Sequence, residues 1–118
     1  AGGVLSGKYN DDARPEGARF TNYLNAGERQ QVMAERFVND KSIASTKEFM
    51  GIAQEEGMSV VTLATAWSKQ ADFVASTIVG ATHPDQLDDI IAAADVTISV
   101  AANKKIDSIS RRHRYPMG

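Results

Sequence analysis

Residues 74–79, with the sequence VASTIV, constrain the fold more than any other segment of the 118-residue chain. This run has little alternation of polar and apolar residues, which is typical of a parallel β-strand buried on both faces. It is the one convincing strand, and a strand requires neighbours to satisfy its backbone N–H and C=O groups. The pattern therefore predicts a piece of a larger α/β domain.

Helices and one loop are predicted before this run. Apolar pairs at i,i+4 spacing predict an amphipathic helix over residues 28–38. A second helix is expected over residues 43–56, with Ser42 as its N-cap and Gly57 as its C-terminal stop. Residues 9–27 are rich in Asn, Asp, Gly and Pro, so we expect a long loop, and loops of this length tend to be functional or disordered.

Three further helices are predicted from apolar stripes and capping residues. Ser59 is expected to cap the first of them, and Ser99 is expected to cap the last, which runs to about Arg112. The side chains predicted to be buried on these helices are Val60, Leu63, Ala64 and Trp67, then Leu87, Ile90, Ile91 and Ala94, then Val100, Ile106 and Ile109.

Composition excludes several classes of protein. A content of 42% hydrophobic and 24% charged residues is ordinary for a soluble globular domain. The net charge of −2 provides no polycationic surface, so no nucleic acid partner is expected. No apolar run has the roughly 18 to 20 residues of a membrane span, so no membrane insertion is expected. The absence of cysteine excludes disulfides and fits a reducing cytoplasm, where we expect the protein.

The segment STIVGATHPDQLDD, residues 76–89, passes from the predicted strand into a helix. Gly80 permits close approach of a ligand to the backbone, and Thr82 followed by Asp85 resembles a capping box. Pro84 suits a first helical turn. Free N–H groups and the helix dipole at such a position favour an anion, whereas the alternative is a plain turn capped for stability.

Five segments carry a resemblance to a known family. They are AGGVLSGKY at residues 1–9, PEGAR at 15–19, VVTLATAW at 60–67, STIVGATHPDQLDD at 76–89 and ADVTIS at 94–99. Together they resemble the C-terminal part of aldo-keto reductases, especially the Tas-like and potassium-channel β-subunit-like branches. The likeness covers nearly the whole chain.

The resemblance implies the C-terminal portion of a (β/α)8 TIM barrel, with the fragment mostly helical and one clear barrel strand. Residues 1–118 would form its cofactor-binding part. Residues 1–27 would be the cofactor and substrate loop, and residues 28–118 would contribute the last helices, the last strand and the C-terminal tail. The remainder of the same barrel would be a necessary partner.

The resemblance also implies NADPH-dependent reduction of an aldehyde or ketone by hydride transfer. The family's catalytic Asp, Tyr, Lys and His lie upstream of this segment, so no catalytic residue is expected here and the isolated chain is expected to be inactive. Tyr9, Tyr23, Tyr115, His83 and His113 do not occupy that motif. Two alternatives remain: a non-enzymatic NADPH-binding regulatory subunit of the channel β-subunit type, and a stand-alone helical interaction module.

Eight cofactor-binding residues are implied by matching the family's motifs. Ala1, Gly2 and Lys8 would contact the pyrophosphate, Arg19 would lie near the adenosine end, Gly80 and Thr82 would hold the 2′-phosphate, and Gln86 and Asp89 would contact the adenine and ribose. His83 stands where many members have Arg or Lys, and Ile90 stands where the family often has Asn.

Three other groups of residues have simpler interpretations. The adjacent carboxylates of residues 11–12 and 88–89 do not converge on one ion, so no metal site is expected. The basic run at residues 111–114 is expected to be a solvated cluster that compensates the helix dipole. The resemblance implies that Tyr115 and Met117, in the tail, border the substrate pocket.

Overall fold

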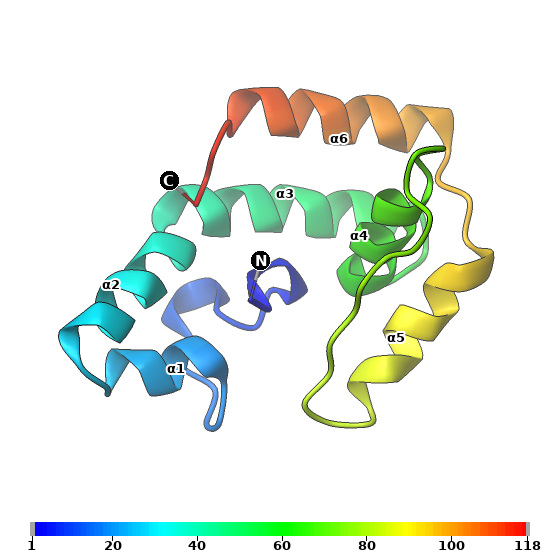
Figure 1. The fold of residues 1–118 in the computed structure, drawn as a ribbon. Coiled ribbons are helices and arrows are strands. Elements are labelled where there is room, and N and C mark those ends of the chain that lie inside the picture. The colour runs from blue at the N-terminus through cyan, green and yellow to red at the C-terminus, as the bar shows by residue number, and fades with distance from the viewer. Residues whose placement is uncertain (1, 118) are drawn as a thin grey trace.

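A computed structural model describes residues 2–117, and these residues form helices joined by turns and irregular segments (Figure 1). In chain order the elements are η1 (Val4–Ser6), η2 (Asn10–Asp12), α1 (Arg19–Leu24), α2 (Glu28–Phe37), α3 (Asp40–Glu55), α4 (Val60–Lys69), α5 (Gln86–Ala92), η3 (Ala93–Asp95) and α6 (Val100–Arg112). None of the helices in this described part is both long and apolar enough to cross a membrane.

The predicted strand is absent, which corrects the expected fold class. Residues 74–79 form an irregular segment, and no strand occurs anywhere between residues 2 and 117. The Ile78 side chain is 97% exposed, although the apolar run predicted burial on both faces. The physical reason is that no other segment of the described chain provides a neighbouring strand. One hydroxyl contact, between Ser68 Oγ and Thr77 Oγ1 at 3.0 Å, ties this segment to α4.

The larger hydrophobic cluster joins α3, α4 and α6. Helix α6 runs back along α3 in the opposite direction (Figure 1). Ile52 of α3, Leu63 of α4, and Ile106 and Ile109 of α6 are buried together. Their burial confirms the predicted apolar stripes of α4 and α6 at these positions.

A second hydrophobic cluster orders the segment that was predicted to be a long loop. The Tyr9 ring is buried, and its hydroxyl oxygen accepts a hydrogen bond from the Phe20 backbone N–H at 3.1 Å. The Phe20 ring stacks on Phe37 of α2, with ring centroids 5.2 Å apart. Burial of these aromatic rings stabilises α1 within residues 9–27, so the prediction of a continuous loop there is wrong.

The predicted caps are confirmed at three positions. Ser59 Oγ accepts from the Thr62 N–H at 3.0 Å, and Ser99 Oγ accepts from the Ala102 N–H at 3.0 Å. Gly57 has a φ of 71°, and the following N–H, of Met58, donates to the carbonyl of Ala53 at 3.0 Å. The Gly57 N–H also donates to the carbonyl of Gln54 at 3.1 Å, and these two bonds at Gly57 and Met58 form a Schellman motif that ends α3.

The cap of α3 lies three residues earlier than predicted. Asn39 is the N-cap, and its side chain accepts from the Ser42 N–H at 3.0 Å. Ser42 Oγ in turn accepts from the Asn39 N–H at 3.1 Å, so the two residues form a reciprocal capping box. Asn and Ser are both good N-cap residues. Because α3 already begins at Asp40, Asn39 is the residue that precedes the first helical turn and caps it.

Several side chains predicted to be buried are exposed. Trp67 is 46% exposed and Val100 is 74% exposed, and Leu87 and Ile91 of α5 are exposed as well. The accessible surface is 7868 Å², whereas a compact monomer of 12.7 kDa has roughly 6,200 Å². The described chain therefore presents apolar surface that its own residues do not cover.

Replacing Asn39 with alanine should destabilise the protein by about 1 to 2 kcal/mol, because the substitution removes an N-cap. Besides capping α3, Asn39 Nδ2 donates to the carbonyls of Arg36 and Pro116, each at 2.9 Å. Urea denaturation of wild type and Asn39→Ala measures the change. Asn25→Ala is the control, since Asn25 makes one exposed side-chain bond to the carbonyl of Thr21 at 3.3 Å. Equal effects of the two substitutions would contradict this account of the cap.

Candidate ligand site

An open cavity of about 570 Å³ lies where the N-terminal turn meets α1 and α2. We call it the N-terminal cavity. Its lining residues are Gly2, Arg19, Phe20, Tyr23, Arg29, Gln30, Met33 and Phe37. Two of the predicted cofactor-binding residues, Gly2 and Arg19, therefore share one cavity.

The backbone of Gly2 packs directly on an aromatic ring of this cavity. Gly2 has a φ of 58°, and a Cβ atom placed on it would lie 2.5 Å from Cζ of Phe20. Any larger residue would be strained and would also collide with a side chain that is held in the second hydrophobic cluster. Glycine at this position therefore allows the close approach of backbone to ring that shapes the cavity.

Lys8 lies against the same N-terminal turn. A Cβ atom on Gly3 would be 2.7 Å from Cε and 2.9 Å from Nζ of Lys8. The Lys8 ammonium also lies 5.4 Å from the centre of the Tyr9 ring, a cation–π distance. The structure thus brings Gly2, Lys8 and Arg19 into one region, while Ala1 lies outside the described residues.

The charge of the N-terminal cavity is positive. Arg19 and Arg29 are exposed, and no carboxylate in the described part of the chain lies within ion-pair distance of either guanidinium. The residues that line the cavity include no Asp or Glu. Guanidinium groups without carboxylate partners, beside aromatic side chains, are suited to a ligand that carries phosphate. The donor set therefore fits an anionic nucleotide.

The other four predicted residues lie on a separate segment. Figure 1 shows α5 at the opposite side of the molecule from α1 and α2. Gly80, Thr82, Gln86 and Asp89 are all exposed on or just before this helix. A Cβ atom on Gly80 would meet nothing within 4 Å, so no close contact within the chain requires glycine there. The structure does not bring the eight residues into one cavity.

The predicted capping box between Thr82 and Asp85 is not formed. Helix α5 begins at Gln86, and Asp85 has helical dihedral angles and makes no side-chain cap bond. The Thr82 N–H instead donates to Oε1 of Gln86 at 3.0 Å. His83 Nδ1 lies 3.2 Å from Oδ2 of Asp85. The amide expected to be free for an anion is therefore bonded to a side chain in this structure.

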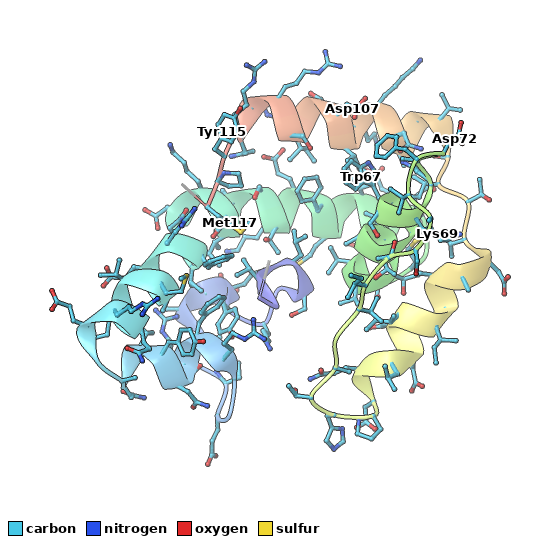
Figure 2. All side chains as sticks on the ribbon, in the orientation of Figure 1. Trp67, Lys69, Asp72, Asp107, Tyr115 and Met117 are labelled. Carbon is cyan, nitrogen blue, oxygen red and sulfur yellow. The ribbon has the colours of Figure 1, made fainter. Side chains whose placement is uncertain are left out.

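The C-terminal tail folds back from the end of α6, where Figure 2 shows Tyr115, toward the start of α3, where it shows Met117. Arg36 Nε donates to the carbonyl of Met117 at 2.8 Å. Tyr115 is 84% exposed and has a φ of 51°, an uncommon conformation for a residue with a large side chain. The tail is thus held by bonds to its backbone, and the Tyr115 ring faces solvent.

The basic run at the end of α6 is more than a solvated cluster. Arg112 donates to Oε2 of Glu48 on α3, and His113 Nε2 lies 2.7 Å from Oε1 of the same carboxylate. The hydrogen bond from His113, with a further contribution from Arg112, holds the pKa of Glu48 below its usual value. The carboxylate thereby joins α3 to the start of the tail.

Six residues that line the N-terminal cavity were not predicted as cofactor-binding residues: Phe20, Tyr23, Arg29, Gln30, Met33 and Phe37. Arg29 did have a detectable signal in the sequence. It is the second residue of α2, and the helix dipole disfavours a cation in the first turn. A residue that breaks a local rule of this kind is a candidate for a functional role.

Comparisons with known proteins agree with the resemblance in the sequence. The sequence model of the Aldo/keto reductase family matches residues 1–111. Protein tas of Escherichia coli (strain K12) is 32% identical over 120 residues, covering 97% of this chain and 31% of that protein. A probable voltage-gated potassium channel subunit beta of Arabidopsis thaliana is 37% identical over 98 residues, covering 81% of this chain and 28% of that protein.

These matches show that the chain belongs to the aldo/keto reductase family. The chain spans about a third of the length of the curated relatives it matches.

Glu48→Gln should lower stability at neutral pH, and the loss should disappear in acid. Because the native pKa of Glu48 is depressed, its stabilising contribution is present above the usual value of 4.5 and is lost as pH falls through the native value. The difference in unfolding free energy between wild type and variant, measured by urea denaturation at several pH values, should therefore shrink below pH 4.5. Glu35→Gln, on the exposed side of α2, is the control. A difference that grows on acidification would contradict the assignment.

Proposed function

We propose that this chain is the cofactor-binding part of an NADPH-dependent reductase that acts on aldehydes or ketones. Family membership supports the reductase class. The observation that carries the proposal is the N-terminal cavity, in which Gly2 and Arg19 lie together with no acidic residue in the lining. NADPH, when bound, supplies the hydride that reduces the carbonyl group.

The residues of this chain would bind and orient the dinucleotide. In the proposal, Gly2 and Lys8 hold the pyrophosphate and Arg19 lies near the adenosine end of the dinucleotide. Residues 80–89 receive the 2′-phosphate, adenine and ribose. Binding of the phosphate at Thr82 requires that its N–H exchange the side-chain oxygen of Gln86 for a phosphate oxygen. The proton donor for the carbonyl lies in the remainder of the protein, so the isolated chain is inactive.

The remainder of the reductase also covers the exposed apolar surface. Trp67, Ile78 and Ile91 are exposed in this chain, and the total surface exceeds that of a compact monomer of the same mass. Because buried apolar area stabilises a fold by about 25 cal/mol per Å², covering this surface is a substantial driving force for association. We place the complete protein in the cytoplasm, which agrees with the absence of cysteine from these 118 residues.

A second candidate is a regulatory subunit that binds NADPH without rapid turnover. It is favoured by the identity of 37% to a protein named as a probable voltage-gated potassium channel subunit beta. The two functions share the cofactor site, so cofactor binding alone does not distinguish them, whereas turnover does. Steady-state NADPH oxidation with an aldehyde by the complete protein would support the reductase.

Thr82→Ala in the complete protein should weaken NADPH binding roughly three- to thirtyfold and leave NADH binding nearly unchanged. Removing the hydroxyl contact should cost about 0.6 to 2 kcal/mol, and NADH lacks the 2′-phosphate. Gln86→Ala should weaken both cofactors about equally if the residue contacts adenine. Fluorescence titrations of both cofactors provide the dissociation constants.

Thr97→Ala, at an exposed threonine before α6, is the matched control and should change neither constant. Equal weakening of NADPH and NADH in Thr82→Ala would place the 2′-phosphate elsewhere. Failure of the wild-type protein to bind either cofactor would overturn the proposed function.

A further inference from the structure

We infer that Arg29 is a second arginine that binds the pyrophosphate of the dinucleotide, together with Arg19, which the family resemblance places nearer the adenosine end. This inference rests on the proposed function, because it adds a binding residue to the same site. None of the predicted cofactor-binding residues comes from α2, which carries Arg29.

The helices that carry the two arginines, α1 and α2, pack on each other. Arg19 is the first residue of α1 and Arg29 is the second residue of α2. Directly after Arg19, the buried Phe20 ring stacks on Phe37 of α2 at 5.2 Å and meets Tyr23 edge-to-face at 5.9 Å. The aromatic contacts position the two helices so that both arginines line the N-terminal cavity beside Gly2.

These two guanidinium groups are available to a ligand, unlike several other basic groups of the chain. Lys47 pairs with Asp11, Lys105 with Glu55, and Arg112 with Glu48. Within residues 2–117, neither Arg19 nor Arg29 has a carboxylate within 4.0 Å.

The two arginines are a local excess of positive charge in a chain whose net charge is negative. The net charge is −2, yet the lining of the N-terminal cavity contains two arginines and no carboxylate. Like charges that line one cavity repel each other to a degree set by their separation, and an anion between them is attracted to both. A bound anion would convert this repulsion into two attractive contacts.

A pyrophosphate matches this arrangement better than a single carboxylate does. It carries oxygens on two phosphorus atoms, and each planar guanidinium can donate two parallel hydrogen bonds to one phosphate. The cavity volume of about 570 Å³ lies within the usual range for small-molecule sites, about 300 to 1,000 Å³. Tyr23 and Met33 provide an apolar wall for the adjoining sugar or base.

The experiment is a titration of the complete protein with NADPH and, separately, with NADH, followed by fluorescence. Arg29→Gln should raise both dissociation constants by a similar factor, roughly three- to thirtyfold, because both cofactors carry the pyrophosphate. The factor should fall as salt is raised, since the lost contact is electrostatic. Arg29→Lys, which keeps the charge and loses the planar fork, should give a smaller increase.

The double variant Arg19→Gln/Arg29→Gln tests whether the two residues bind one group. If they do, the combined factor should differ from the product of the two single factors. Arg111→Gln is the matched control, since Arg111 is an exposed arginine on α6 and should leave both constants unchanged.

Three results would overturn the inference, and they are distinguishable. Unchanged binding in Arg29→Gln, with weakened binding in Arg19→Gln, overturns the role of Arg29 and leaves the proposed function standing. Weakening of NADPH alone would place Arg29 at the 2′-phosphate and not at the pyrophosphate. Absence of binding by the wild-type protein overturns the proposed function and this inference together.

Discussion

Helix α3 is the element on which the rest of the described structure depends, because it contributes to both hydrophobic clusters. Near its start Ile43 packs against the cluster of Phe20 and Tyr9, and near its end Ile52 and Ala53 are buried with α4 and α6. The caps at Asn39 and Gly57 fix where the helix begins and ends. The same helix thus supports the N-terminal cavity on one side and the α4–α6 packing on the other.

Features that depend on neighbouring residues in the chain could be predicted from the sequence. The caps at Ser59, Ser99 and Gly57 need only a few residues of local context, and all three are confirmed. Features that depend on distant partners were predicted less well. The apolar pattern of residues 74–79 and the stripe position of Trp67 predict burial, but burial requires a covering surface, and the described chain does not provide one.

The candidate site also has features that depend on the local sequence and features that depend on distant partners. The family resemblance implies cofactor contacts for Gly2, Lys8 and Arg19, which stays a prediction, and the structure places these three residues around one N-terminal turn. Arg29 could not be grouped with them from the sequence, because the cavity forms only when α1 packs on α2. The pairing of Thr82 with Gln86 was also missed, since the start of α5 is three residues later than the local capping pattern predicts.

We propose that this chain needs the remainder of the protein to cover its exposed apolar surface. Thermal unfolding of the isolated 118-residue chain, followed by near-ultraviolet circular dichroism with the molecular mass measured in parallel, tests it most directly. The account predicts a weak, broad transition or self-association for the chain alone, and a sharp transition when it is joined to the remainder of the protein. A sharp cooperative transition of the isolated, monomeric chain would contradict the account.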